Sequence, residues 1–376
     1  MIAKLSSFKI GLLATGDEIA LGDILNTNTQ RIAQQLTSAG YCVGNHLITT
    51  DQKPDIENAL RFLLQHHQVI IITGGLGPTS DDRTRFALSD VIQQALVFDE
   101  ASWQAIVAHF AKLNIAVHDS NKQQALFPKN AQILDNPHGT AAGCYVYYQD
   151  RLIFLLPGPP HECLPMFEQK ALPKIQQQYG QGTRQVIKWR LIGVVEADIA
   201  AMLDELIQHH PCTTGYRLDP PYLEVKIYAE KHAVLKQLLP KINQTLAPYQ
   251  LDPLNQTALQ LLTDCLHHYQ GILKINDYAT AGLFVSRIIS PLLREKIACD
   301  TTMSHCDIEI YIEGLAEIWN VDLSKQHTNL TIKFQQSTKT YQIEKMLPLR
   351  RHPYTLLYAI ELIAWEIYQF IIHQPV

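Results

Sequence analysis

The segment TGGLGPTSDDRTR, beginning at Thr73, holds the residue types best suited to chemistry in this sequence. Glycines lack a Cβ and let a ligand approach the backbone, and unpaired N–H groups at a helix start favour an anion. The adjacent carboxylates of Asp81 and Asp82 suit a divalent cation that bridges to substrate phosphates, typically Mg²⁺, with Mn²⁺ or Co²⁺ as substitutes. The candidate phosphate contacts are Thr73, Gly74, Gly75, Gly77, Pro78, Thr79 and Ser80.

A purely structural interpretation of this segment stays open. In it the segment is a strand-to-helix turn, Ser80 or Asp81 caps the helix, and the glycines serve only the turn geometry. Two carboxylates beside a phosphate site make sense only when a cation lies between them, which favours the functional interpretation.

Two further regions carry similar residues. ATGDEIALGDILNTN contributes Gly16, Asp17, Glu18 and Asn28, while HGTAAG and LPGPPHEC contribute Gly139, Thr140, Gly158, Pro159 and Glu162. Glu162 suits a metal ligand or a general base, and equally a first-turn glutamate that complements the helix dipole. We consider Asp82 and Glu162 as the candidates for orienting a water molecule.

The elements that position these residues alternate between strand and helix patterns over the first 170 residues. FKIGLLAT, YCVGNHLITT and QVIIIT are typical of strands, and they alternate with the helical segments TNTQRIAQQLTSAG and KPDIENALRFLLQHH. CYVYY and RLIFLL predict a hairpin. The order predicts an α/β fold with a doubly wound sheet, whose ligands bind beyond the carboxyl ends of the strands.

The pattern changes after this region. Residues 185–250 read as β-α-β-β-α and predict a small α+β insert that lacks the G-x-x-G clamp of RNA-binding modules. APYQLDPLNQT is the expected linker to a third domain, an α/β domain. In SHCDIEIYIEG we expect a strand with Ile308, Ile310 and Ile312 facing a core, in preference to a metal cluster of His305, Cys306, Asp307 and Glu309.

Composition narrows the function classes. The net charge of -5 provides no basic field for nucleic acid or an anionic membrane surface. Seven cysteines without a C-x-x-C pair and a start without a signal peptide indicate a cytoplasmic protein. The apolar segment Tyr354–Ile372 contains Glu361 and Glu366, so we expect a buried helix or an oligomer contact and no membrane span. The histidine pair His66–His67 is expected to end a helix as a cation.

Four motifs in register carry a family resemblance: TGDEIALGDILNTNTQRIAQQL, TGGLGPTSDDRTR, NPHGTAAG and LPGPPHECLPMF. They closely resemble the CinA-like family over residues 8–170, and more weakly over 171–250. The resemblance implies a molybdopterin-binding (MoCF-like) domain at 1–170, a KH-like insert at 171–250 and a CinA C-terminal domain at 251–376. It also implies that the glycine and aspartate loop binds a pyrophosphate-containing nucleotide or a pterin.

In the same family the C-terminal domain often is a nicotinamide mononucleotide deamidase with the motif A-E-S-C-T-G-G. The matching stretch here is INDYATAGLF, and gapless placement puts Tyr278 at the position of the serine nucleophile. A phenol is bulkier and cannot simply replace that hydroxyl, so the resemblance implies an inactive deamidase site.

The sequence and the resemblance together predict a metal-dependent pyrophosphatase that acts on ADP-ribose or a related small-molecule nucleotide. The first alternative is a protein that binds a nucleotide or molybdopterin without turnover, and the second is residual deamidase activity. The apolar C-terminal helix and the middle insert favour a homo-oligomer, with a dimer as the simplest form.

Overall fold

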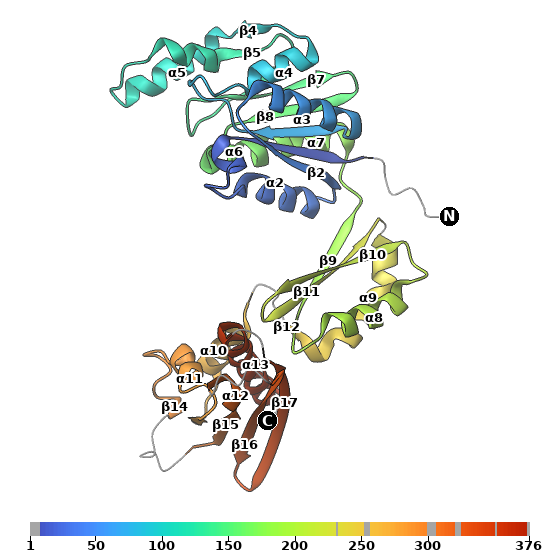
Figure 1. Cartoon of the computed structure of the whole chain (residues 1–376), viewed down its shortest axis with the longest axis vertical. Coiled ribbons are helices and arrows are strands. Elements are labelled where there is room, and N and C mark those ends of the chain that lie inside the picture. Colours follow the sequence, from blue (N-terminus) through green and yellow to red (C-terminus); the bar gives the residue numbers. More distant parts are fainter. Residues whose placement is uncertain are drawn as a thin grey trace. The chain divides into compact units, whose positions relative to one another are not determined.

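The computed structural model describes residues 8–230, 232–251, 256–298, 306–319, 325–349 and 352–373 (Figure 1). The chain divides into two compact units, one of residues 1–186 with 229–232 and one of residues 187–228 with 233–376. The second unit holds a four-stranded and a five-stranded sheet, so the separate middle and C-terminal domains stay a prediction.

A six-stranded sheet forms the centre of the first unit, in the order β2-β1-β3-β8-β7-β6. The strands are β1 (Ile10–Thr15), β2 (Val43–Thr49), β3 (Val69–Thr73), β6 (Gln132–Leu134), β7 (Gly143–Tyr148) and β8 (Arg151–Leu156). β2, β1, β3 and β8 run parallel, while β7 pairs antiparallel with β8 and with β6. The α/β fold and the β7–β8 hairpin are therefore confirmed.

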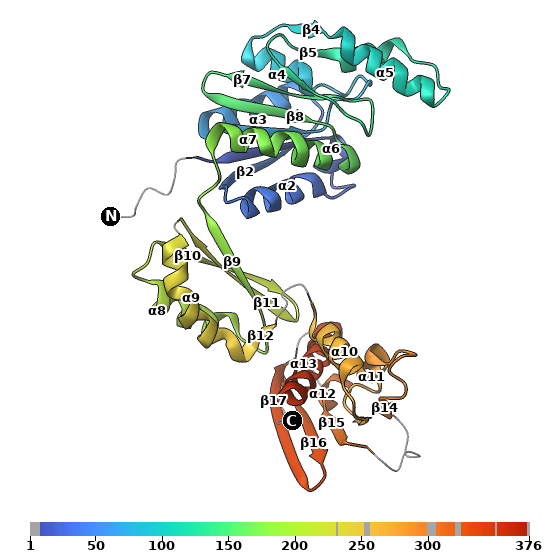
Figure 2. The same ribbon diagram turned by 180° about the vertical axis from the view of Figure 1, so that it is seen from behind.

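Helices cover both faces of this sheet, as Figures 1 and 2 show. α3 (Lys53–His66) and α4 (Thr84–Ile92) pack on one face, where they meet Ile70 and Ile72 of β3. α2 (Thr27–Ser38), α6 (Pro160–Met166), the π-helical turn Phe167–Ala171 and α7 (Leu172–Tyr179) pack on the other, against Val69 and Ile71. Every residue of β3 is buried, because β-branched side chains fill both faces.

An excursion between α4 and the hairpin completes the first unit. It contains β4 (Leu96–Phe98), α5 (Glu100–Lys112), the 3-10 helix Asp119–Ala125 and β5 (Leu126–Pro128), which pairs antiparallel with β4. Asp99 caps α5, since its carboxylate accepts a hydrogen bond of 2.7 Å from the Ser102 N–H.

The four-stranded sheet of the second unit has the order β10-β11-β9-β12. It comprises β9 (Gln185–Ile192), β10 (Cys212–Asp219), β11 (Tyr222–Ala229) and β12 (Gln250–Leu251), with α8 (Glu196–Ile207), α9 (His232–Leu246) and the 3-10 turn Ala247–Tyr249. The β-α-β-β-α order is confirmed. Leu223, Val225 and Ile227 are all buried, as the alternation in β11 predicts.

The five-stranded sheet has the order β14-β13-β15-β16-β17. It comprises β13 (Leu273–Asp277), β14 (Ile297–Ala298), β15 (Ile308–Gly314), β16 (His327–Gln336) and β17 (Lys339–Pro348), with α10 (Ala258–His268), α11 (Leu283–Ile288), α12 (Ala316–Trp319) and α13 (His352–Ile372). Ile308, Ile310 and Ile312 are fully buried, which confirms the expected strand. His305 lies outside the described residues, and those residues contain no group of three or more metal-ligating side chains able to hold an ion.

The apolar C-terminal segment forms much of the core of the second unit. Within the described residues it is the one helix long and apolar enough to cross a membrane, and 56% of its most apolar window is buried inside the protein. Glu361 of α13 is 5% exposed and accepts hydrogen bonds from the Tyr222 hydroxyl at 2.6 Å and from the Leu259 N–H at 3.0 Å. The expected buried helix is thus observed.

Candidate functional site

A cavity of about 490 Å³ opens where β1, β3 and β8 end, at the carboxyl edge of the first unit's sheet. Most of the residues predicted from the sequence line it: Gly16, Glu18, Asn28, Thr73, Gly74, Gly75, Gly77, Pro78, Asp81, Asp82, Thr140, Gly158, Pro159 and Glu162. Asp17, Thr79, Ser80 and Gly139 are not among its lining residues. The topology therefore brings four separate sequence motifs to one site.

The conformation of the glycine turn after β3 is set by the side chains that pack against its glycines. Gly74 and Gly75 have φ angles of 100° and 65°. A Cβ on Gly75 would lie 2.1 Å from the Thr84 hydroxyl oxygen, and one on Gly77 would lie 2.4 Å from an Asp82 carboxylate oxygen. Glycine at these positions therefore lets the loop close on its own side chains. Gly74, Gly75 and Gly77 also line the cavity, and their contact with a phosphate stays a prediction.

Asp82 belongs to that closed loop. Its Oδ2 atom accepts hydrogen bonds from the Thr79 N–H at 2.9 Å and from the Thr79 hydroxyl at 2.6 Å. Asp81 is exposed, and hydrogen bonding by the Thr79 side chain lowers the pKa of its carboxyl. Neither Ser80 nor Asp81 caps α4, because Arg83 occupies the N-cap position and makes no side-chain cap bond.

Asp51 is a further carboxylate of the cavity lining, beside Glu18, Asp81 and Asp82, and sequence reasoning missed it. Its Oδ2 accepts from the Asp17 N–H, and Oδ1 of Asp17 accepts from the Asp51 N–H, both at 3.0 Å. Burial raises the pKa of Asp51, and the charges of Asp17, Glu18 and Asp81 add to this, against the hydrogen bond from the Asp17 N–H, which lowers it. Its position just after β2 could have pointed to it, because the loop that follows β2 lies at the same edge of the sheet as the other loops of the site.

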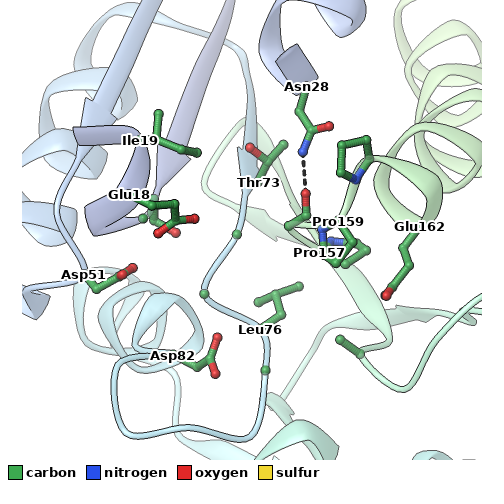
Figure 3. A pocket seen from close by; sticks show the side chains of 18 of the residues that line it. Glu18, Ile19, Asn28, Asp51, Thr73, Leu76, Asp82, Pro157, Pro159 and Glu162 are labelled. Carbon is green, nitrogen blue, oxygen red and sulfur yellow. Dashed lines mark hydrogen bonds between the residues drawn. The ribbon is translucent and has the colours of Figure 1, made fainter. Parts of the chain in front are cut away.

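Glu162 lies across the glycine turn from Glu18 and Asp51, as Figure 3 shows. Its side chain is 13% exposed, and its Oε2 atom accepts a hydrogen bond of 2.6 Å from Asn136 Nδ2. A Cβ on Gly139 would lie 2.4 Å from the Glu162 carboxyl carbon, so the glycine of HGTAAG makes room for this carboxylate. Asn136 is a positioning residue that sequence reasoning did not single out.

Further hydrogen bonds hold the walls of the cavity in place. Asn28 Nδ2 donates to the Gly158 carbonyl at 2.6 Å, the contact drawn in Figure 3, while Asn28 Oδ1 is buried without a partner. Arg85 is 2% exposed and donates to the carbonyls of Leu76 at 2.8 Å and Ala142 at 3.0 Å. This buried guanidinium therefore ties the glycine turn to the HGTAAG loop.

The charge of the cavity wall is one-sided. Five carboxylates line it: Glu18, Asp51, Asp81, Asp82 and Glu162. Among the described residues the lining contains no Lys, Arg or His side chain, although His161 Nε2 lies 3.7 Å from Glu162 Oε1 just outside it. An anionic diphosphate entering such a cavity needs a cation between itself and the carboxylates. Mg²⁺ is commonly held by one or two carboxylates and by substrate phosphates, so this donor set fits it even though no three ligands converge among the described residues.

Comparison with known proteins identifies the class of the first domain and then the family. Residues 11–177 match the family model described as "Probable molybdopterin binding domain", so the first unit is an α/β domain of the MoCF-like class. A Clostridium botulinum (strain Langeland) protein named "Putative competence-damage inducible protein" is 30% identical over 298 residues, which cover 79% of this chain and 68% of that protein. The chain therefore belongs to the CinA-like family.

Two further similarities were found. A "CinA-like protein" of Geobacter metallireducens is 34% identical over 235 residues, covering 61% of this chain and 57% of that protein. The crystal structure of CinA from Thermoplasma acidophilum, described as a protein of unknown function, is 30% identical, with a TM-score of 0.42 and coverage of 45% of this chain and 98% of the other.

Proposed function

We propose that the first unit hydrolyses the diphosphate bond of ADP-ribose or of a related nucleoside diphosphate compound, with a divalent metal such as Mg²⁺. One observation carries the proposal: in the described part of the chain, the lining of the cavity has five carboxylates and no Lys, Arg or His. A carboxylate-lined site at the carboxyl edge of an α/β sheet suits a metal-bound anion better than a neutral ligand.

In the proposed reaction water adds to one phosphorus and the bridging P–O bond breaks, so ADP-ribose and water give AMP and ribose 5-phosphate. Asp81 and Asp82 would hold the metal, which offsets negative charge on the phosphates when bound. Glu162 would accept the proton of the attacking water through Oε1, because Asn136 already engages Oε2.

The structure favours Glu162 over Asp82 as the base. Two hydrogen bonds from Thr79 hold Oδ2 of Asp82 in its own loop, whereas Glu162 lies on the other side of the glycine turn and its Oε1 is not engaged by Asn136. We therefore propose Asp82 as a metal ligand and Glu162 as the general base.

The test is release of AMP from ADP-ribose by the purified protein with Mg²⁺, Mn²⁺ or Co²⁺ and with a chelator. We expect metal-dependent release in the wild type and a fall of roughly 100-fold or more in a variant carrying Asp81→Ala and Asp82→Ala. Asp119→Ala, which removes an exposed carboxylate outside the cavity lining, should retain the activity. No metal-dependent release in the wild type would reject the proposal.

A second candidate function is binding of a nucleotide or molybdopterin without turnover. It is favoured by the bonds that tie Asp82 into its own loop and by the description of the matching family model. Calorimetry that shows metal-dependent binding of ADP-ribose, together with unchanged substrate after prolonged incubation, would select this candidate.

We also propose that the deamidase site of the C-terminal part is inactive. Tyr278 stands at the nucleophile position and is 68% exposed. The nearby Thr280 hydroxyl is bonded to the Asp277 carboxylate and accepts from the Phe284 N–H at 2.9 Å, so it supports the turn after β13. Ammonia release from nicotinamide mononucleotide by the full chain would overturn this assignment.

A further inference from the structure

A second cavity, of about 540 Å³, lies along one face of α5. Its floor is made by small side chains spaced along that helix, Ala101, Ala105 and Ala108, and its opposite wall by the segment from Ile133 to Thr140. From Ala101 to Lys112 the helix extends about 16 Å, so this α5 groove is elongated.

The α5 groove meets the carboxylate-lined cavity at one loop. Thr140 lines both cavities, and Gln124 fixes its hydroxyl with a bond of 3.1 Å. Asn136 and Gly139 line the groove, and on the far side of the same loop they hold Glu162 and make room for it. The residue proposed to act on the diphosphate therefore stands at the boundary between the two spaces.

The two spaces differ in chemistry. The first cavity is lined by acidic side chains and also by the apolar Ile19, Ile24 and Leu25. The groove combines a floor of small apolar side chains with hydrogen-bonding groups of both kinds: His109 and Lys112 as donors, and Asp99, whose Oδ2 also caps α5, as an acceptor. A sugar has the same pattern, because its C–H faces are apolar and its hydroxyls need donors and acceptors.

We propose that the α5 groove is the second half of the binding site and holds a ribose or another hydroxyl-bearing sugar attached beyond the diphosphate. This inference rests on the proposed function and narrows its substrate class. The substrate is a two-ended diphosphate: its nucleoside occupies the first cavity, its diphosphate lies at the glycine turn, and its distal sugar passes Thr140 into the groove. A ligand without the distal sugar, such as ADP or AMP, uses the first cavity alone.

The test fills the groove and compares ligands with and without the distal sugar. Ala105→Trp places an indole on the groove face of α5, and Ala111→Trp places one at an exposed position of the same helix outside the groove lining. Binding of ADP-ribose and of AMP is measured by calorimetry with Mg²⁺, and AMP release from ADP-ribose and from ADP is measured in parallel.

We expect Ala105→Trp to weaken ADP-ribose binding by roughly tenfold or more, while AMP binding stays unchanged. Ala111→Trp should change neither. The inference would be overturned if Ala105→Trp weakened the binding of both ligands equally, or had no effect, or if the wild type did not bind ADP-ribose. It would also be overturned if Ala105→Trp changed the oligomeric state and left the affinity for ADP-ribose unchanged. Selective loss of ADP-ribose binding without any hydrolysis in the wild type would reject the proposed activity and support the groove.

Discussion

At the scale of single residues, Glu162 carries the most specific catalytic prediction. Glu162→Gln keeps the shape and an oxygen for Asn136 but cannot accept a proton, so we expect hydrolysis to fall roughly 100-fold or more with little change in ligand affinity. Glu168→Gln is the matched control, because Glu168 is exposed and lies outside the cavity lining. Activity of Glu162→Gln close to that of the wild type would remove this residue from the mechanism.

A second residue-scale prediction concerns His67, which we expected to be a helix-ending cation. It is instead 1% exposed: its Nε2 accepts from the Asn45 N–H at 3.2 Å, and its Nδ1 lies 3.1 Å from the Leu63 carbonyl. Burial lowers the pKa of His67, so the folded protein holds the neutral ring. The neighbouring His66 is exposed.

Because the folded pKa of His67 lies below the unfolded value, protons bind preferentially to the unfolded chain. The stability associated with His67 is therefore complete above pH about 6.5 and decreases as the pH falls through that value. Urea denaturation at pH 7.5 and 5.5 should show this decrease in the wild type and in His66→Gln, and a smaller one in His67→Gln. The same pH dependence in both variants would contradict the assignment.

Single residues also show what the sequence could not provide. The motifs identified most of the cavity lining, because they follow strands whose carboxyl ends meet at one edge of an α/β sheet. Asp51 and Asn136 were missed, since their roles depend on partners 34 and 26 positions away. The functions of Gly75, Gly77 and Gly139 likewise became visible only with the atoms that fill the space beside them.

At the scale of elements, the turn after β3 sets the shape of the site. Gly75→Ala would place a residue at a φ of 65° and against the Thr84 hydroxyl, so we expect a loss of roughly 2 kcal/mol or more in unfolding free energy. Gly158→Ala is the control, because its Cβ would have an ordinary contact of 3.6 Å with Gly74 Cα. Chemical denaturation with equal losses in both variants would refute this explanation of the turn.

The start of α4 supports a further element-scale prediction. Burial lowers the pKa of Arg85 to about 10, so the guanidinium remains charged at neutral pH while it bonds two loop carbonyls. Arg85→Lys cannot reproduce both bonds, and we expect a loss of about 1–3 kcal/mol with weaker metal-dependent binding. Denaturation and calorimetry measure the two effects, and wild-type values in both would show that the loops hold their positions without this bridge.

Most elements were predictable from the sequence because their periodicity is strong. The run Val69–Ile72 is typical of a strand covered on both faces, and the alternation of Ile308, Ile310 and Ile312 predicted the buried face of β15. The α5 groove was not predictable. Its walls come from segments whose separate patterns carry no sign that they face each other.

At the scale of the whole molecule, we predict a homo-oligomer, with a dimer as the simplest form. β17 is an edge strand of ten residues on which Met346 is 69% exposed and Tyr341 44% exposed. Exposed edges and apolar side chains of this kind are commonly covered by another chain. Light scattering should give at least twice the mass of one chain, and a monomer at micromolar concentration would contradict the prediction.

The central claim is that the carboxylate-lined cavity holds a divalent cation together with a diphosphate. Its most direct test is a crystal of the full chain soaked with Mn²⁺ and ADP-ribose, or with its hydrolysis products, and measured by anomalous scattering. We predict an anomalous peak in contact with Asp81 or Asp82 and with phosphate oxygens. A bound ligand without that peak, and with Asp82 still bonded only to Thr79, would contradict it.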